Sequence, residues 1–202
     1  MNINTATRTP GRPREFEIEA ALDKAIVVFS ERGYHAASIS ELKDAMGLAA
    51  GSLYKAFKDK KAIFLASFDR YKQVRNALLE QQLAEGENGR DKVSRMLRFY
   101  AEASHGDNGR RGCLVVGTAI ELAVYDADAA ERVDRSMARS EALFDSLIRE
   151  GQADGSIPQA IDPAATARLL LSVTQGLRVL GKTGPNRDRA FSVVDTAMKL
   201  LD

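Results

Sequence analysis

Apolar residues recur every three or four positions along nearly the whole chain, which is the spacing of one face of a helix. The first such stretch covers about 16–32, where Ala21, Ala25 and Phe29 share one side and Gly33 marks the end. No stretch alternates apolar and polar residues with the period of two that a half-buried strand requires. The pattern therefore predicts an all-α chain.

The same pattern predicts about nine helices in total. Those that follow the first cover about 38–46, 50–57, 60 into the 80s, 90–103, 113–124, 129–154, 163–180 and 188–201. The stretch HGDNGRRG at 105–112 is predicted to be a loop because it is rich in glycine and polar residues. Asp162 and Pro163 supply an N-cap and a first-turn proline for the next-to-last helix.

Two short helices near the N-terminus meet at a tight turn. Ser38 and Glu41 form the S-x-x-E pattern of a capping box, in which each side chain accepts from the backbone N–H of the other residue. Gly47 ends the first of the two helices, because glycine readily adopts a positive φ. The pair is typical of a helix-turn-helix, in which one helix crosses behind the other.

The second helix of this pair has two different faces. Leu53 and Phe57 are predicted to point inward, whereas Ser52, Tyr54 and Lys55 point outward. A helix that is held from behind and free on its polar face can enter the major groove of DNA. The helix pair therefore predicts a DNA-binding segment.

Residues 1–14 show no helical periodicity and carry Arg8, Arg12 and Arg14 within the run RTPGRPR. A flexible basic arm of this kind fits the minor groove, whose negative potential attracts arginine. A solubilising terminus without any DNA contact is the alternative, and composition leaves both interpretations open.

The charge distribution supports DNA binding only modestly. The formal net charge is +1. Residues 1–75 hold 13 Lys and Arg against 9 Asp and Glu, while the remainder holds 16 against 19. The basic excess therefore lies in the segment that contains the helix pair, where a polyanion would bind.

Cysteine content and hydropathy predict a soluble, cytoplasmic protein. Cys113 is the single cysteine, so an intramolecular disulfide is impossible and a reducing compartment is favoured. No apolar stretch approaches the roughly 20 residues that span a bilayer. The N-terminal segment also lacks the apolar core of a secretion signal.

Catalysis and metal binding find little support in the sequence. The two histidines, His35 and His105, lie far apart along the chain. The patterns H-E-x-x-H, G-x-S-x-G and the P-loop are missing, and one cysteine cannot build a cysteine-rich zinc site. We therefore predict neither an enzyme nor a metal or cofactor site.

The segment from Gly11 to Phe64 resembles the DNA-binding domain of the TetR family of repressors. The matching features are the GRPR arm, Ala25 and Phe29, Gly33-Tyr34, S-x-x-E-L from Ser38, Ala45, Gly47 and GSLYKAFKDK at 51–60. The resemblance implies a flexible basic arm over 1–14 and a three-helix DNA-binding domain over 15–60. It further implies a helical ligand-binding and dimerisation domain over 61–202, although this region matches the family only generically.

The resemblance also implies individual DNA contacts. These are phosphate contacts by Ser38, Ser40, Tyr54 and Lys60, base-edge positions at Ala50, Gly51 and Ser52, a guanine or phosphate contact by Lys55, and arm contacts by Arg12 and Arg14. Among the base-edge positions, only Ser52 can hydrogen-bond a base through its side chain. We therefore expect the DNA to be read largely through phosphate positions, apolar fit and DNA shape.

The last two helices are implied to form a four-helix bundle between two chains. The expected interface residues are Leu169, Val173, Gly176, Leu177, Leu180, Phe191, Val194 and Met198. Packing of these faces on their own domain is the alternative.

A ligand cavity among the central helices is implied in the same way. Its candidate residues are Phe68, Phe99, Tyr100, Cys113, Gly117, Glu121, Phe144 and Leu147, which favour a hydrophobic or aromatic inducer. Glu121 is a carboxylate on a nearly apolar helix, so it pairs with an arginine, points to solvent or meets a polar ligand atom. Cys113 would sense oxidants or electrophiles if Arg110 and Arg111 lower its pKa, and is otherwise a small buried apolar residue.

These observations predict a homodimeric repressor that a small-molecule inducer releases from a palindromic double-stranded operator. Two alternatives stay open, namely an activator of the same fold and a helical ligand-binding or interaction module without DNA binding. Binding to the DNA upstream of its own gene would separate the module from the regulators.

Overall fold

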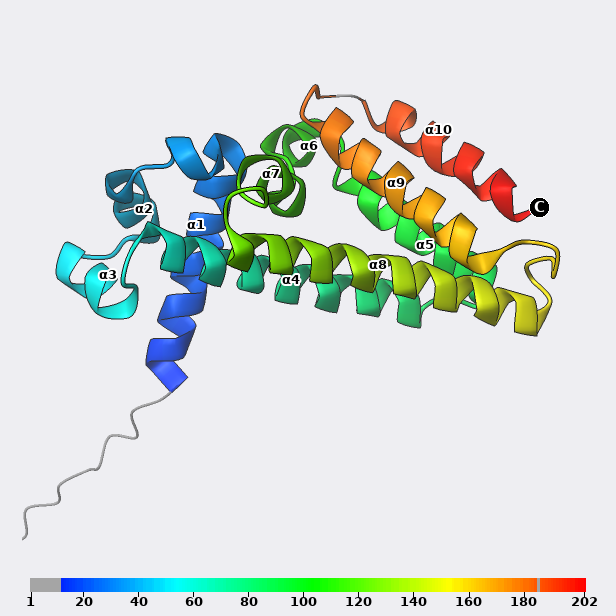
Figure 1. Cartoon of the computed structure of the whole chain (residues 1–202), viewed down its shortest axis with the longest axis horizontal. Coiled ribbons are helices and arrows are strands. Elements are labelled where there is room, and N and C mark those ends of the chain that lie inside the picture. Colours follow the sequence, from blue (N-terminus) through cyan, green and yellow to red (C-terminus); the bar gives the residue numbers. More distant parts are fainter. Residues whose placement is uncertain (1–11, 185) are drawn as a thin grey trace, which may run out of the picture.

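The computed structural model describes residues 12–184 and 186–202, and this part of the chain folds into helices without any strand (Figure 1). Within it lie ten α-helices and one terminal 3-10 helix. Their bounds are α1 Arg12–Ala36, α2 Ile39–Met46, α3 Ala50–Ala56, α4 Lys60–Ala84, α5 Gly89–Glu102, α6 Gly106–Arg111, α7 Leu114–Glu121, α8 Ala127–Asp154, α9 Pro163–Gly181, α10 Arg187–Ala197 and the 3-10 helix Met198–Leu201. The all-α prediction is confirmed.

One predicted loop is a helix. Residues 106–111 form the short α6, so the described chain has ten α-helices where the sequence indicated about nine. Asp107 lies in its first turn and Arg110 and Arg111 in its last, which suits the helix dipole despite the glycines. Gly112 then ends it with a φ of 91°.

The first helix begins earlier than predicted and ends where predicted. Residues 12–14 of the expected arm form the first turn of α1, while the rest of that arm, including Arg8, lies outside the described residues. Gly33 interrupts α1 with a φ of 79° and a ψ of 174°, so the regular helix stops just before it. Tyr34, His35 and Ala36 form a separate turn after this break.

The helices make an elongated molecule with α1, α2 and α3 at one end (Figure 1). The long helices α4 and α8 both extend from that end toward the opposite one. The last two helices, α9 and α10, lie side by side along the upper edge in the same view. This arrangement separates the predicted DNA-binding end from the predicted dimer face.

Two apolar clusters form the core, and some helices contribute to both. The first packs α1–α3 against the start of α4, α7 and the start of α8, with Phe29 and Phe68 at its centre. The second packs the end of α4 with α5, α8, α9 and α10 around Met96, Phe144 and Leu170. Because α4 and α8 belong to both clusters, a shift of either helix would change the packing at both ends of the molecule.

Candidate DNA-binding surface, ligand cavities and dimer face

The unit of α2 and α3 is fixed by the local hydrogen bonds that its sequence predicts. Ser38 Oγ accepts from the Glu41 N–H at 3.1 Å, and the Glu41 carboxylate accepts from the Ser38 N–H at 3.0 Å, which completes the capping box. Gly47 ends α2 in the left-handed region with a φ of 68°. Leu42 and Leu53 are buried beneath the two helices. The first core cluster thus holds α3 from behind, and its outer face is free.

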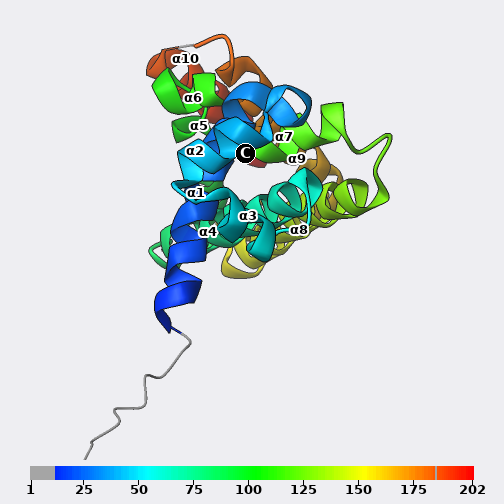
Figure 2. The same ribbon diagram turned by 90° about the vertical axis from the view of Figure 1, so that its left-hand side faces the viewer.

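The helix α3 lies on the side of the molecule that faces the viewer in Figure 2. Its outer face carries the residues predicted to contact DNA. Ala50, Gly51, Ser52, Tyr54 and Lys55 are all exposed, and Tyr54 shows 59% of its surface to solvent. A phenol hydroxyl and an ammonium group on one exposed ridge can both donate hydrogen bonds to phosphate oxygens. The three small residues beside them allow a close approach to the DNA but offer little base-specific chemistry.

Two of the residues expected to bind phosphates already have partners within the protein. Lys60 Nζ donates to the Ala37 carbonyl at 2.9 Å and to the His35 carbonyl at 3.3 Å, which ties the start of α4 to the segment before α2. Ser38 is engaged in the capping box. Ser40 is exposed in the first turn of α2 and is free to meet a phosphate.

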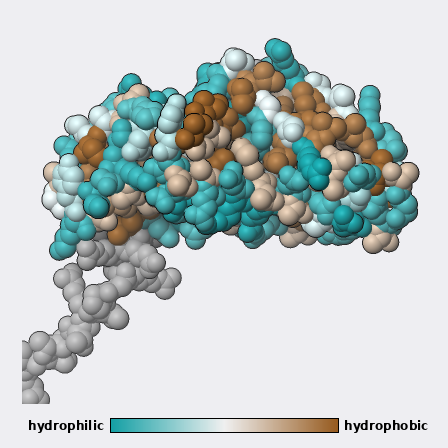
Figure 3. All heavy atoms as spheres, in the orientation of Figure 1, coloured by the Kyte–Doolittle hydropathy of each residue, from teal (hydrophilic) through white to brown (hydrophobic). Residues whose placement is uncertain are grey.

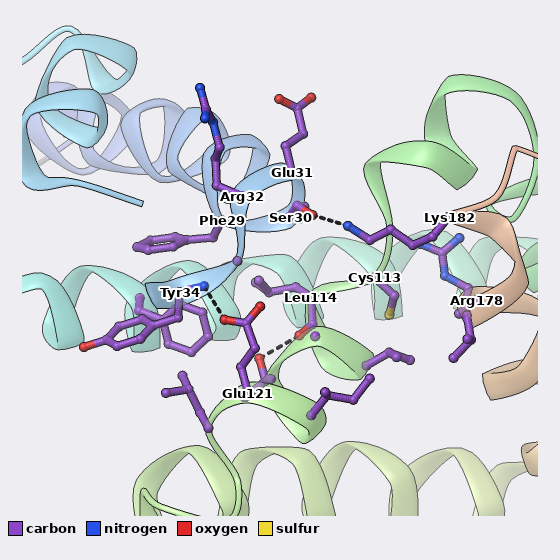
Figure 4. A pocket seen from close by; sticks show the side chains of 18 residues that line it. Phe29, Ser30, Glu31, Arg32, Tyr34, Cys113, Leu114, Glu121, Arg178 and Lys182 are labelled. Atoms are coloured by element: carbon purple, nitrogen blue, oxygen red, sulfur yellow. Dashed lines mark hydrogen bonds between the residues drawn. The ribbon is translucent and has the colours of Figure 1, made fainter. Parts of the chain in front are cut away.

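A hydrogen-bonded junction joins the N-terminal helices to α7. The Glu121 carboxylate accepts from the Tyr34 N–H at 2.8 Å and from the His35 N–H at 3.5 Å (Figure 4). Both amides follow Gly33, and a Cβ at that glycine would lie 2.1 Å from Glu121 Oε1. Glu121 therefore accepts from backbone amides, partners that its sequence context did not suggest, and it stays half-buried on the wall of a cavity.

Ion pairs at the start of α4 strengthen the same junction. Lys61 Nζ lies 2.6 Å from an Asp126 oxygen and 2.8 Å from an Asp128 oxygen. Asp126 also caps α8, because it accepts from the Ala129 N–H at 3.0 Å. The hydrogen bond from Lys61 holds the pKa of Asp126 below its usual value. The first turns of α4 and α8 are thereby held together.

A cavity of about 290 Å³ lies beside this junction, where the end of α1 meets α7 and α9 (Figure 4). Its lining residues are Phe29, Ser30, Glu31, Arg32, Gly33, Tyr34, Phe64, Cys113, Leu114, Val116, Gly117, Thr118, Ile120, Glu121, Leu122, Arg178, Val179 and Lys182. Lys182 crosses one side of it and donates to the Ser30 carbonyl at 2.9 Å. The volume is close to the lower limit for a small-molecule site.

A second cavity, of about 30 Å³, lies among α4, α5, α8 and α9. Its lining residues are Tyr71, Lys72, Arg75, Asn76, Leu79, Phe99, Tyr100, Cys113, Val115, Ser136, Met137, Ser140, Gln175 and Arg178. Cys113 and Arg178 also line the larger cavity, so the two cavities are neighbours.

The structure separates the predicted pocket residues into cavity walls and plain core. Phe99 and Tyr100 line the small cavity, Gly117 and Glu121 line the larger one, and Cys113 lines both. Phe68, Phe144 and Leu147 line neither cavity and are buried in the two core clusters. Periodicity could not make this distinction, because core residues and cavity walls share the same inward face.

The surroundings of Cys113 differ from those that the sequence suggested. Arg110 and Arg111 each form an ion pair with an acidic residue of their own. Burial raises the pKa of the Cys113 thiol, but the Arg178 guanidinium, a backbone N–H of α7 and the Tyr71 hydroxyl outweigh it and lower the pKa below its usual value. The cation beside the thiol therefore comes from α9, far away in the sequence.

This arrangement leads to a direct measurement. We expect the Cys113 thiol to titrate below the ordinary range for cysteine, which ultraviolet absorbance of the thiolate follows in the full-length protein. Arg178→Met removes the main charge that lowers the pKa and should raise it. Arg111→Met is the control, because that guanidinium pairs with Glu31 instead. Equal thiol pKa values in the two variants would contradict the assignment.

An exposed apolar face, called here the α9–α10 face, runs along the last two helices (Figure 3). It consists of Leu169, Val173, Leu180, Val193 and Leu200. Leu169 and Leu180 are 48% and 52% exposed. A shallow groove between the two helices is lined by apolar side chains together with Ser192 and Thr196. A monomer gains nothing from such a surface, whereas a partner that covers it removes apolar area from water.

The predicted interface residues do not all lie on this face. Leu169, Val173 and Leu180 lie on it, and a Cβ at Gly176 would meet nothing within 4 Å. Leu177 and Val194 are buried in their own core instead. Phe191 packs under the Arg187 guanidinium at 4.0 Å, and Met198 packs against the second cluster. Because α9 has apolar residues on several sides, its sequence did not show which side faces outward.

Three cationic residues at the small cavity escaped the sequence analysis. Arg178 is a charged residue within an apolar stretch of α9. The same kind of pattern drew attention to Glu121 on α7, so it could also have indicated Arg178. Lys72 and Arg75 lie between the apolar positions of α4, and charges at such positions are ordinarily assigned to a solvated face.

In the part of the chain that the structure describes, no three His, Cys, Asp or Glu side chains converge as a metal site would require. Nor does any helix in residues 12–184 or 186–202 combine the length and apolarity needed to cross a membrane.

Comparison with known families gives matches over both halves of the chain. Residues 21–67 match the model described as "Bacterial regulatory proteins, tetR family". Residues 89–198 match the model described as "Tetracyclin repressor-like, C-terminal domain". The first match contains α2, α3 and the start of α4. The second match contains α5, α7, α8 and α9, which contribute residues to the walls of the two cavities.

Individual relatives cover nearly the whole chain. The HTH-type transcriptional repressor ComR of Escherichia coli (strain K12) is 28% identical over 194 residues, which are 96% of this chain and 92% of ComR. The uncharacterized HTH-type transcriptional regulator YezE of Bacillus subtilis (strain 168) is 27% identical over 196 residues, 95% of this chain and 100% of YezE. A solved structure of the TetR family regulator CifR, a cysteine mutant complexed with 26bp double-strand operator DNA, is 29% identical with a TM-score of 0.80 and covers 96% of this chain and 98% of CifR.

Proposed function

The chain belongs to the TetR family of bacterial transcriptional regulators, and we propose that it is a homodimeric repressor whose C-terminal region binds a small-molecule inducer. The observation that carries the proposal is the outer face of α3, which is exposed and held rigidly from behind by α2. ComR is named as a repressor, and CifR has been solved on operator DNA, which supports the same role here. Chromosomal DNA as the partner makes the cytoplasm the site of action.

DNA binding would use α3 of each subunit in successive major grooves of a palindromic operator, about one helical turn apart. Tyr54 and Lys55 donate to phosphates, and Ser52 provides the one side-chain hydrogen bond to a base. Ala50 contacts thymine methyl groups, and Arg12 and Arg14, which lie in the first turn of α1, supply the minor-groove contacts. This mode relies on phosphate geometry and DNA shape more than on base-edge hydrogen bonds.

Induction would use the contacts between the cavities and the N-terminal helices. A ligand that prefers one arrangement of α4 and α7 shifts the population toward it. The Lys61 ion pairs keep the starts of α4 and α8 together, and the Glu121 junction then carries that shift to α1. The recognition helices of the two subunits move out of register with the operator, and the repressor dissociates.

The decisive test is selection of bound DNA from a random pool with the purified full-length protein. A palindromic consensus with half-sites about one helical turn apart is expected. Recovery of unrelated sequences at low salt would overturn the proposal, because a regulator must prefer its operator over other DNA.

Tyr54 provides a second, residue-level prediction. Tyr54→Phe removes one hydrogen bond to a charged phosphate oxygen and should weaken operator binding about tenfold, or ~1.4 kcal/mol, in a fluorescence anisotropy titration. The thermal midpoint should not change, because the hydroxyl is exposed in the free protein. Tyr125→Phe is the matched control, since Tyr125 is 84% exposed in the loop between α7 and α8. Equal affinities of both variants would remove Tyr54 from the interface.

A further inference from the structure

Three cationic side chains meet at the small cavity among α4, α5, α8 and α9. Lys72 and Arg75 come from α4, and Arg178 comes from α9. Arg178 is only 4% exposed, and Lys72 and Arg75 are partly buried. Burial lowers the pKa of both Lys72 and Arg75, and a neighbouring guanidinium lowers each one further. The molecule thus concentrates positive charge where water is scarce, which is unfavourable unless an anion joins it.

No carboxylate of the described residues lies within ion-pair distance of these three side chains. Other arginines nearby do have carboxylate partners. Arg70, Arg132 and Arg139 lie on the same pair of helices, α4 and α8, and each has a carboxylate oxygen at 3.0 Å or less. The fold therefore supplies acidic partners to neighbouring arginines, two of which are equally half-buried, and none to this cluster.

The cations are held in place by groups that do not neutralise them. Arg178 donates to the Gly112 carbonyl at 2.7 Å and to Ser104 Oγ at 3.4 Å. The Arg75 guanidinium lies 3.8 Å from the centre of the Phe99 ring. These contacts orient the two guanidinium groups. Carbonyl dipoles and an aromatic face carry no net negative charge, so they do not neutralise the two cations.

Cys113 alone cannot balance the cluster. Its thiol accepts from the Tyr71 hydroxyl at 3.7 Å and is shifted toward the thiolate by Arg178. A thiolate carries one negative charge, whereas Lys72, Arg75 and Arg178 carry three positive ones. A net positive charge therefore persists at the cavity in either protonation state of the thiol.

We propose that this cavity binds the carboxylate group of a small organic acid, held between the guanidinium groups of Arg75 and Arg178. A guanidinium fork matches the two oxygens of a carboxylate. The volume of about 30 Å³ has room for ~two water-sized groups, which suits a carboxylate better than a four-oxygen phosphate. The small cavity therefore takes the carboxylate alone, and the neighbouring cavity of about 290 Å³, which shares Cys113 and Arg178 with it, has room for a short hydrocarbon or aromatic body.

The regulatory consequence rests on the proposed function, whereas the binding itself does not. Arg178 holds the Gly112 carbonyl just before α7, and α7 ends at Glu121 of the junction with α1 (Figure 4). A carboxylate that draws Arg178 toward the cavity changes its hold on Gly112 and thus the position of α7. The acid anion would in this way be the inducer.

The test measures binding and DNA release separately, with the full-length protein at constant ionic strength. Sodium acetate, butyrate and benzoate are compared with acetamide, butyramide and benzamide, and with inorganic phosphate. At least one carboxylate should raise the thermal midpoint with saturation, while its amide and phosphate should not. The same carboxylate should raise the pKa of Cys113, because it screens Arg178 from the thiol.

Arg75→Met identifies the site. Methionine can still pack against Phe99, and removal of an unpaired, partly buried cation should raise the thermal midpoint of the free protein. The half-saturating carboxylate concentration should rise at least tenfold in this variant. Arg139→Met is the matched control, because Arg139 already pairs with Glu80, and it should respond like the unaltered protein.

The possible results distinguish the proposed carboxylate site from the proposed repressor function. Equal effects of acid and amide, no saturable effect of any of the three carboxylates, or an unchanged response in Arg75→Met would each overturn the proposed site. Carboxylate binding without any operator binding would retain the site and overturn the repressor function instead. Operator binding that a bound carboxylate leaves unchanged would retain the site and the repressor function and overturn the role of the acid anion as inducer.

Discussion

Replacing Leu180 with glutamate will leave the protein monomeric and unable to hold its operator. Leu180 lies on the α9–α10 face, two helical turns after Val173 on α9, and is 52% exposed in the single chain. In a four-helix bundle between two subunits, the new carboxylate would be buried without a partner. An unpaired buried charge costs several kcal/mol, and two-fold symmetry introduces it twice.

The effect on DNA binding should be larger than that of any single contact on α3. A dimer gains affinity because binding of one half-site raises the effective concentration of the second α3 at the other half-site. A monomer loses this advantage, so operator affinity should fall roughly 100-fold or more. Light scattering coupled to size exclusion would report the mass, and anisotropy would report the affinity.

A matched variant separates the interface from general damage. Leu78→Glu changes the same residue type at a similar exposure of 45%, but on α4 and away from the α9–α10 face. This variant should remain dimeric and bind the operator normally. A dimeric Leu180→Glu protein with intact operator binding would show that the subunits associate through another surface.

Local features of the fold could be read from the sequence because their causes are local. The capping box of Ser38 and Glu41 and the left-handed Gly47 follow from residues that lie within a few positions of each other. The inner and outer faces of α3 follow from the helical period, which placed Leu53 inside and Tyr54 outside. These features locate the predicted DNA-binding surface.

The dimer face could be predicted only in part, because α9 has apolar residues on several sides. Leu177 and Leu180 are both apolar and three positions apart, yet one is 4% exposed and the other 52%. The difference depends on where α5, α8 and α10 pack, which no local pattern encodes. Packing also decides the place of Val194 on α10, which is fully buried in its own core and does not reach the predicted interface.

Contacts between distant segments could not be predicted at all. The amides that Glu121 accepts from are 86 and 87 residues away, and their availability depends on the break at Gly33. Arg178 and Arg75 come together only because α9 and α4 border the same cavity. For Glu121 and for Arg178, the sequence shows a charged residue within an apolar stretch. Whether that charge has a partner depends on the tertiary structure.

Replacing Glu121 with alanine should loosen the N-terminal helices from the C-terminal core. The variant leaves the Tyr34 and His35 amides without their acceptor, and loss of a charge-assisted hydrogen bond costs roughly 1–3 kcal/mol. Because α1 is then less firmly fixed to α7, the two recognition helices of a dimer lose their fixed spacing. Operator affinity should fall about tenfold or more, and inducer should change the remaining affinity far less than in the unaltered protein.

Hydrogen exchange gives this prediction its most direct measurement. The amides of Tyr34 and His35 should exchange faster in Glu121→Ala, while those of α10 should keep their protection. Glu121→Gln retains an acceptor without the charge and should recover part of the protection. Glu131→Ala is the control, since Glu131 forms an exposed pair with Arg135 on α8 and should change stability by less than about 0.5 kcal/mol. Unchanged exchange at Tyr34 together with a full inducer response would exclude Glu121 from the coupling, and the contacts of α1 with Lys182, Arg111 and Arg70 would then be the next links to test.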